Sequence, residues 1–163
     1  MSRRCSSILQ RAACDYARTL AYYILNAFTG EAGLRERAAD LLRLGMWGVD
    51  ADEPHRDALA AGDLVVVYLG APDREFIGRA ELASAVHAWT PTEAQVYPGA
   101  SSSGVSLARV EEWGRPVPMN VVLARLDPSA KAKADFEVGV VRITEHEYET
   151  VLAVAGEHAP STG

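Results

Sequence analysis

The sequence predicts an α+β protein in which five to six short, mostly antiparallel strands form a small β-barrel with flanking helices. Three observations support this fold class. The chain has 163 residues, which favours one domain. Short runs of aromatic and β-branched residues recur between turn-forming residues, as strands do. Only about three segments carry a helical pattern. Closing such strands into a barrel removes exposed edges and leaves a mouth that can serve as a pocket.

A strand and a helix are predicted first. Residues 22–28 are rich in aromatic and β-branched side chains, which favours a strand. Residues 31–44 carry leucine and alanine side chains on one helical face, and Gly45 is placed to end this helix. Pro54 favours the first turn of a second, short helix through residue 60, with Glu53 as its N-cap.

A hairpin is predicted next. Residues 64–69 are almost continuously apolar, which predicts a central strand, and residues 70–73 have the composition of a turn. Residues 75–86 are the expected partner strand. Within it, Gly78 indicates a bulge or the close approach of another backbone.

The second half of the chain has a weaker pattern. Loop composition predicts irregular segments at residues 87–104, 115–118 and 127–135, the last of them a mobile loop. Two more strands are predicted at residues 105–110 and 138–143. Residues 119–126 fit either a short helix or a strand. Thr144 and Glu147 form a capping-box pattern that begins a helix through Val154.

The predicted domain covers residues 21–156. Residues 157–163 are expected to be a disordered tail, and residues 1–20 an N-terminal extension that is helical or disordered. This extension has four arginines and one acid, a composition faintly like that of an organelle transit peptide, but a frayed N-terminal helix or an upstream start codon is the favoured interpretation.

Bulk composition excludes several classes of protein. The net charge of −6 argues against non-specific coating of a nucleic-acid backbone, although a local basic patch stays open. No run approaches the ~18 apolar residues of a membrane span. Cys5 and Cys14 are the two cysteines, and neither has a partner at metal-ligand spacing. A cytoplasmic protein without a membrane segment or a zinc site is therefore expected.

Four short motifs follow one another along the chain. They are Met46-Trp47-Gly48-Val49, Ala61-Gly62-Asp63 before an apolar strand that reaches Tyr68, Phe76-Ile77-Gly78, and the closing run at residues 141–148. Each motif is weak alone, but their order and spacing over residues 21–154 resemble the small stand-alone prokaryotic EVE domains, relatives of the YTH readers of methylated adenine. The resemblance implies a PUA-like barrel that holds one modified base flipped out of a DNA or RNA strand.

The resemblance also implies a pocket with an aromatic wall. Trp47 would be that wall, Gly48 and Val49 would offer backbone groups to the base edge, and Asn26 matches a polar position of the pocket. The related readers bring a second tryptophan from a strand that here contains Leu107-Ala108-Arg109-Val110 and no aromatic residue.

Other side chains are candidates for the second wall. Those that could replace the tryptophan are Trp89, Tyr97, Trp113 and, by stacking, Arg109. Tyr68 is expected in the core with its hydroxyl at the rim. Arg142 is a candidate phosphate or base contact, or else a surface ion pair.

Stacking alone does not make a selective pocket. A stacked base contributes roughly 1–3 kcal/mol. One buried methyl group adds about 0.8 kcal/mol, which is only about a fourfold preference. Discrimination therefore requires a hydrogen-bond site that leaves the wrong base unsatisfied. Asn26 is the best candidate because its amide both donates and accepts, and Thr29 is a weaker one.

Each candidate also has a purely structural interpretation. Trp47 could pack the first helix onto the barrel, since large aromatic side chains are mostly buried. Asn26 could cap a turn. Trp89, Tyr97 and Trp113 could anchor loops.

The sequence lacks a catalytic pattern. The four histidines are far apart and have no motif partners. Asp50, Asp52 and Glu53 lie near His55, but their spacing matches no catalytic or metal motif and is typical of a solvated loop. The sequence predicts a non-enzyme without a metal or a cofactor.

Three functions remain open at this stage. The first is a module that binds a modified nucleobase in DNA or RNA. The second is a small-molecule or nucleotide sensor that uses the same pocket, which the acidic net charge favours. The third is an adaptor that binds a protein partner in a defence or RNA-processing complex, and an exposed apolar patch would favour it.

Overall fold

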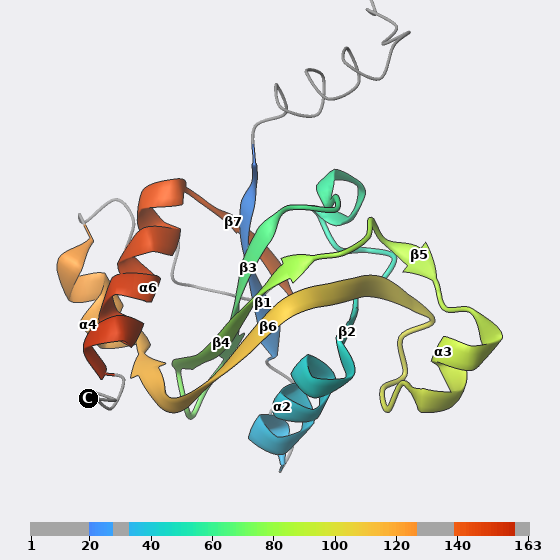
Figure 1. Ribbon diagram of the computed structural model, residues 1–163, viewed down its shortest axis with the longest axis horizontal. Helices are drawn as coiled ribbons and strands as arrows, with labels where there is room; N and C mark the ends of the chain where they lie inside the picture. The colour runs from blue at the N-terminus through green and yellow to red at the C-terminus, as the bar shows by residue number, and fades with distance from the viewer. Residues whose placement is uncertain (1–19, 28–32, 127–138, 159–163) are drawn as a thin grey trace, which may run out of the picture.

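The strands of the protein form one curled, mixed sheet, a half-barrel with helices on both sides (Figure 1). The computed structural model describes residues 20–27, 33–126 and 139–158. Within these ranges the strands are β1 (Tyr22–Ala27), β2 (Met46–Gly48), β3 (Leu64–Leu69), β4 (Glu75–Leu82), β5 (His87–Ala88), β6 (Ser103–Pro118) and β7 (Val140–Ile143). The helices are α2 (Leu34–Leu44), α3 (Pro91–Val96), α4 (Met119–Arg125), α6 (Glu145–His158) and the 3₁₀ helix η1 (Arg56–Ala58).

Strand β3 lies in the middle of the sheet, as its continuous apolar run predicted. The sheet order is β2-β6-β4-β3-β1-β7, and β5 pairs with β6. Strand β3 pairs in parallel with β1 and antiparallel with β4, and the remaining pairs between described strands are antiparallel. A strand that is covered on both faces needs apolar side chains at successive positions, because neither face meets water.

The curl of the sheet follows strand β6, which is 16 residues long. Its first residues pair with β2 and β5, and the rest pairs with β4. The β4–β6 register shifts twice, and Arg109 adopts a left-handed φ of 49° at one of these irregularities. A Cβ on Gly78 would lie 2.4 Å from the Glu111 carbonyl oxygen, which confirms the predicted close backbone approach.

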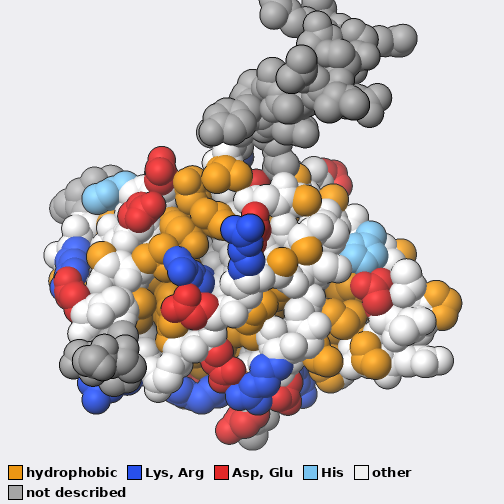
Figure 2. Space-filling model, viewed as in Figure 1, with side chains coloured by type: hydrophobic (Ala, Val, Ile, Leu, Met, Phe, Trp, Pro, Cys, Tyr) orange, Lys and Arg blue, Asp and Glu red, His pale blue; other side chains and the backbone are white. Residues whose placement is uncertain are grey.

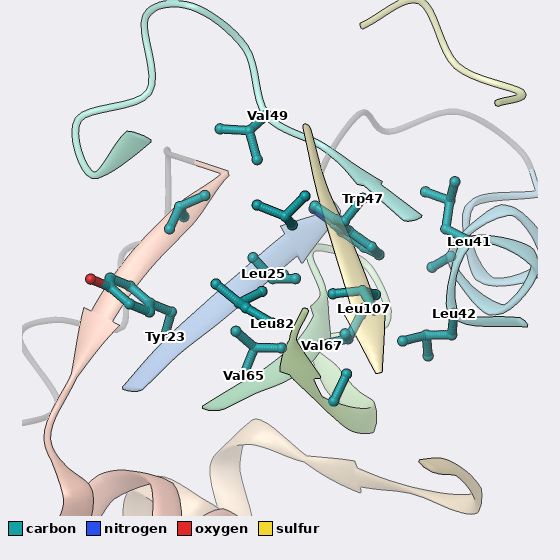
Figure 3. Close-up of a cluster of buried hydrophobic side chains, with 14 of the residues drawn as sticks. Tyr23, Leu25, Leu41, Leu42, Trp47, Val49, Val65, Val67, Leu82 and Leu107 are labelled. Carbon is teal, nitrogen blue, oxygen red and sulfur yellow. The ribbon is translucent and has the colours of Figure 1, made fainter. Parts of the chain in front are cut away.

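Two apolar clusters lie on opposite faces of the sheet, because side chains alternate along each strand. Tyr23, Leu25 and Val67 belong to the cluster inside the curl, to which α2 contributes Leu41 and Leu42 (Figure 3). Ile24 and Val66 belong to the other cluster, which lies under α4 and α6. Helices α4 and α6 lie together at one end of the molecule, and α3 with β5 projects at the opposite end (Figure 1).

Two helix boundaries confirm their sequence signals. Gly45 ends α2 in the left-handed conformation, with φ 72°, and donates its backbone N–H to Leu41 and Leu42. At the start of α6, the Thr144 hydroxyl accepts from the Glu147 N–H at 3.1 Å, and the Glu147 carboxylate accepts from the Thr144 N–H at 2.9 Å. These reciprocal bonds are the predicted capping box.

Two local predictions are wrong. Residues 54–60 form only the short 3₁₀ helix η1, and Glu53 does not cap it, because its carboxylate binds backbone amides of β7 instead. Residues 115–118 are not a turn but the end of β6, where pairing with β4 continues to Pro118. Pro116 lies where the β4–β6 register shifts, between Glu112 and Val117, and a proline is tolerated at such an irregularity.

Other boundaries differ from expectation. Strand β4 ends at Leu82 rather than at residue 86, and residues 105–110 are part of the longer β6. Residues 87–104, expected to be irregular, contain β5 and α3. Residues 119–126 are resolved in favour of a helix, α4. Phe28, Thr29 and residues 127–135 lie outside the described ranges. No helix in the described part of the chain is long and apolar enough to span a membrane.

Candidate nucleobase site

A cavity of about 440 Å³ lies where the end of β1, helix α2, strand β2 and the loop before β6 meet. Residues from five separate stretches of the chain line it: Asn26, Ala27, Leu34, Arg37, Ala38, Leu41, Trp47, Gly48, Asp50, Glu53, Tyr97, Gly99, Ala100, Ser101, Gly139 and Val140. Helix α2 supplies the apolar side of the cavity. The loop after β2 and the loop before β6 supply most of its polar groups.

The polar wall consists of Gly48, Tyr97, Ser101 and Asp50. Each of these residues contacts the next in that order. The Ser101 hydroxyl donates to Asp50 Oδ1 at 2.8 Å. The Tyr97 hydroxyl contacts Ser101 and the Gly48 backbone. A Cβ on Gly48 would lie 2.2 Å from the Tyr97 hydroxyl oxygen, so the absence of a side chain at Gly48 allows the phenol to reach β2.

Burial raises the pKa of Tyr97 above its ordinary value of 10.0. The Asp50 carboxylate acts in the same direction, whereas the Gly48 backbone, Ser101 and Arg37 oppose it. Tyr97 therefore keeps its proton at neutral pH. The cavity presents a neutral phenol that can both donate and accept a hydrogen bond.

Two side chains from the loop after β2 hold this site together. Glu53 accepts from the backbone N–H groups of Gly139 at 2.9 Å and Val140 at 3.1 Å, which ties the loop to the start of β7. Arg56 donates through Nη1 to the Val49 carbonyl at 2.8 Å and to the Ser103 hydroxyl at 3.0 Å. No local pattern in the sequence signals the contact of Glu53 with Gly139 or that of Arg56 with Ser103, because these partners lie 86 and 47 positions apart.

Trp47 belongs both to the cavity lining and to the core. It pairs with Val105 of β6, and it is only 6% exposed. Its ring lies near Leu25, Leu41 and Leu107 inside the curl (Figure 3). Both interpretations of Trp47 therefore describe part of its surroundings: the residue is packed in the core, and it also lines the cavity.

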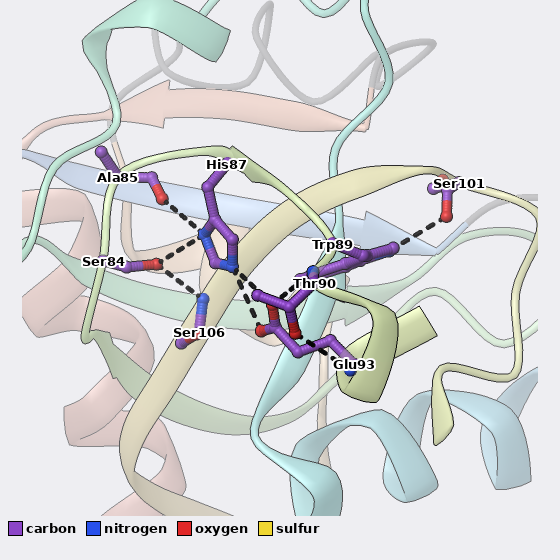
Figure 4. Close-up of polar contacts among 8 residues, drawn as sticks. All are labelled: Ser84, Ala85, His87, Trp89, Thr90, Glu93, Ser101 and Ser106. Atoms are coloured by element: carbon purple, nitrogen blue, oxygen red, sulfur yellow. Dashed lines mark hydrogen bonds and ion pairs between the residues drawn. The ribbon is translucent and has the colours of Figure 1, made fainter. Parts of the chain in front are cut away.

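Trp89 supports Tyr97 from outside the cavity. Its indole N–H donates to the Ser101 carbonyl at 3.0 Å (Figure 4). Its ring centroid lies 5.0 Å from that of Tyr97. His87 meets the same indole ring edge-on at 5.4 Å. A Cβ on Gly104 would lie 2.5 Å from the indole, so this glycine lets Trp89 lie against β6.

The segment that carries these aromatic rings is anchored by His87. Nε2 of His87 lies 3.1 Å from both carboxylate oxygens of Glu93, and Nδ1 lies 3.4 Å from the Ser84 hydroxyl (Figure 4). The hydrogen bond to Glu93 is the main cause of a raised pKa of His87. Glu93 also completes a capping box with Thr90 at the start of α3.

Asn26 lines the cavity at the end of β1 and is 5% exposed. Its backbone N–H donates to the Gly139 carbonyl at 2.8 Å. Strand alternation places its side chain on the Ile24 face of the sheet, next to Tyr68 of β3, rather than on the face that points into the curl.

The remaining candidates do not line this cavity. Val49 is buried, and its N–H donates to the Ser103 carbonyl. Tyr68 packs on Phe76 in the cluster under α4 and α6. Arg109 is exposed and forms an ion pair with Glu81 at 3.3 Å. Arg142 is exposed on β7.

Trp113, the further candidate for the second wall, packs against the cluster under α4 and α6 and donates its indole N–H to Glu111. The structure therefore brings together Asn26, Trp47, Gly48 and Tyr97 at the cavity. Trp89 does not line the cavity, but its ring packs against that of Tyr97.

Arginines across the surface are paired with carboxylates. The ion pairs include Arg35–Glu75, Arg43–Glu112, Arg79–Glu111, Arg109–Glu81 and Arg125–Glu157. On the face shown in Figure 2, blue and red side chains stand next to one another rather than in separate fields. Within the described residues, no group of three or more histidine, cysteine or acidic side chains is placed to hold a metal ion.

No protein-family model matches the sequence, and no curated protein matches it. Solved structures do match. Protein Atu2648 from Agrobacterium tumefaciens is 18% identical, with a TM-score of 0.59, over 83% of this chain and 93% of that chain.

Two further matches were solved as complexes. The YTH domain of Zygosaccharomyces rouxii MRB1, bound to N6-methyladenosine RNA, is 15% identical, with a TM-score of 0.57, over 86% of this chain and 90% of that chain. Human THYN1, bound to DNA containing 5-methylcytosine, is 12% identical, with a TM-score of 0.56, over 86% of this chain and 99% of that chain. Identities this low carry the fold alone. The chain thus has the PUA-like fold shared by EVE and YTH domains, as its motifs predicted.

Proposed function

We propose that this protein is a non-catalytic nucleic-acid-binding module that holds one modified base in the cavity between α2, β2 and the loop before β6. The observation that carries the proposal is the composition of the cavity. It joins Trp47 and Gly48, which belong to the first motif, and Asn26, which the resemblance to EVE domains singled out, to the phenol of Tyr97. Solved structures with this fold include one bound to methylated RNA and one bound to methylated DNA.

The size and the chemistry of the cavity support a base as the ligand. A volume of about 440 Å³ falls within the range of roughly 300–1,000 Å³ that small-molecule sites occupy. Leu34, Ala38 and Leu41 give it an apolar side for the face of a planar ring. The groups of the polar wall can bond to the ring edge.

A second candidate function is a sensor of a free nucleoside or nucleotide that uses the same cavity. The ion pairs of the surface arginines favour it, because a paired arginine has less charge to offer to a phosphate backbone. A sensor would bind the nucleoside as tightly as the strand that contains it. A strand-binding module would bind the strand more tightly.

The test is binding of the purified protein to short single strands of DNA and RNA, each with one N6-methyladenine, one 5-methylcytosine or an unmodified base, followed by tryptophan fluorescence. We expect selective binding of one modified strand. Gly48→Ala should weaken it about tenfold or more, since the new methyl group displaces the Tyr97 hydroxyl from the polar wall, and leaving a buried polar group without its hydrogen bond costs roughly 1–3 kcal/mol.

Gly114→Ala is the matched control, because a Cβ there meets no atom within 4 Å. It should bind as the wild type does. A folded wild-type protein that binds none of the strands or nucleosides would contradict the proposal. So would equal binding by the two glycine variants.

A further inference from the structure

Asp50 holds a fixed carboxylate at the wall of the cavity. Its Oδ1 accepts from the Ser101 hydroxyl at 2.8 Å. Its backbone carbonyl accepts from the Glu53 N–H at 3.2 Å and from Arg56 Nη1 at 3.3 Å. Backbone and side chain are thus both held before any ligand arrives, which reduces the entropy lost on binding.

Asp50 differs in this respect from Glu53, the second carboxylate of the cavity lining. The two oxygens of Glu53 accept from the amides of Gly139 and Val140. In the described part of the chain, no hydrogen bond reaches Oδ2 of Asp50, and the residue is exposed at the cavity. Asp50 therefore has an oxygen that can still accept a hydrogen bond from a ligand, whereas both oxygens of Glu53 hold its loop against the start of β7.

Arg37, on α2, is the one basic side chain among the described residues that line the cavity. It is exposed, and both Arg37 and Asp50 influence the Tyr97 hydroxyl. An exposed guanidinium suits a phosphate, which fixes position, whereas a carboxylate accepts from the edge of a base, which carries sequence information.

We propose that Asp50, oriented by Ser101, selects a base that presents an exocyclic amino group, and that it rejects bases that present a carbonyl at the same position. The inference rests on the proposed function, since it assigns the ligand class of the same cavity. A carboxylate only accepts hydrogen bonds, so an amino group can donate to it, as cytosine N4 does to acidic side chains. The carbonyl of thymine or uracil would face it as a second acceptor.

The selectivity comes mainly from rejection. Placing a carbonyl against the carboxylate leaves both acceptors without a donor, and such a mismatch discriminates more strongly than an extra methyl group does. A preference of about tenfold or more for the amino-bearing base is expected from one such contact.

The sharpest probe is a pair of bases with the same shape. 5-Methylcytosine and thymine have the same ring and methyl group, and they differ in an amino group against a carbonyl and in the proton on the adjacent ring nitrogen. Each is placed in a single-stranded DNA hexamer whose other positions are abasic, so that one base alone is offered. The dissociation constants of the two strands are compared by fluorescence anisotropy.

Wild-type protein should bind the 5-methylcytosine strand about tenfold more tightly than the thymine strand. Asp50→Ala should bring the two dissociation constants together by weakening the first and strengthening the second. Ser101→Ala should bring the ratio of the two dissociation constants closer to one, because it frees the Asp50 carboxylate to rotate. Asp52→Ala removes an exposed neighbouring carboxylate outside the cavity lining, and it should leave the ratio unchanged.

The outcomes separate the two proposals. If wild-type protein binds strands but the ratio is near one, or if Asp50→Ala leaves the ratio intact, the selection by Asp50 is overturned and the base site stands. If wild-type protein binds neither these strands nor any other modified strand or nucleoside, the proposed function itself fails. Thermal melting of each variant identifies any loss of binding that is due to unfolding.

Discussion

At the residue scale, the tryptophan singled out by the motifs has more than one role. Trp47 lines the cavity, but most of its ring is packed in the curl against side chains from β1, α2 and β6. Its position is therefore set by folding, and its contribution to binding cannot be separated from its contribution to stability by removing the whole side chain.

Trp47→Ala is expected to lower the free energy of unfolding by about 3–5 kcal/mol, because it leaves a void in a packed core. Urea denaturation followed by circular dichroism measures this change. Trp113→Ala, at a half-buried indole on the other cluster, should cost less. Equal losses for the two variants would contradict the core position of Trp47.

The residues that the sequence could predict are those whose signal is local. Gly45 and Thr144 mark helix ends, and Gly78 marks a close backbone approach, since each acts on its own segment. The contacts that shape the cavity are different. Asp50 meets Ser101 and Glu53 meets Gly139 across 51 and 86 positions. Nothing in either segment shows which partner the fold will bring to it.

Asn26 illustrates the same limit. Its place near the end of a predicted strand was correct, but the direction of its side chain depends on the pairing of β1 with β3. A shift of one residue along a strand reverses the face on which a side chain lies. The sequence could therefore locate one edge of the cavity without showing which of its polar side chains face it.

At the scale of elements, the segment from β5 to α3 departs most from its prediction. Helix α3 has six residues and none of them is buried, so no apolar periodicity exists that could reveal it. It is held instead by a proline, a capping box and the ion pair of His87 with Glu93. Specific polar contacts thus replace the hydrophobic stripe on which helix prediction depends.

The stability of this segment should depend on pH. The pKa of His87 is raised, first by its hydrogen bond to Glu93, so its contribution is complete below the ordinary value of 6.5 and is lost as pH rises through the raised value. The pKa of Glu93 is lowered, first by the Thr90 backbone, so its contribution is complete above 4.5 and is lost as pH falls through the lowered value. The segment is therefore most stable between 4.5 and 6.5.

Amide hydrogen exchange of residues 88–97, measured inside this window and on the alkaline side of it, checks the expectation. Exchange should accelerate as pH rises beyond the intrinsic increase, and Glu93→Gln should abolish the excess. His146→Ala, which removes an exposed histidine from α6, serves as the control. Identical profiles for Glu93→Gln and wild type would show that the ion pair does not hold the segment.

At the scale of the whole molecule, the net charge of −6 and the paired arginines both weaken the attraction of the protein surface for a phosphate backbone. Five arginines on the described surface form ion pairs with carboxylates that belong to other elements. A strand that reached this surface would have to compete with those partners. Binding by the proposed module should therefore depend on the base in the cavity more than on the phosphate backbone.

Affinity for a single strand should consequently change little with salt. We expect the logarithm of the binding constant to fall with the logarithm of salt concentration with a slope between roughly −0.7 and −2, as for one to three phosphate contacts on a single strand. Arg37→Ala should reduce the slope by about one, whereas Arg109→Ala should not change it. A slope several times steeper would show that an extended backbone interface exists.

The pairing of β1 with both β3 and β7 has a consequence for how the protein is made. Strand β1 leaves the ribosome first among these strands, and its β7 partner emerges more than 100 residues later. The cavity also requires Gly139 and Val140, whose amides hold Glu53. Until those residues are synthesised, β1 has an open edge and the pocket lacks one side. A nascent chain can therefore complete its half-barrel, and acquire the proposed ability to hold a base, only when its last strand has been translated.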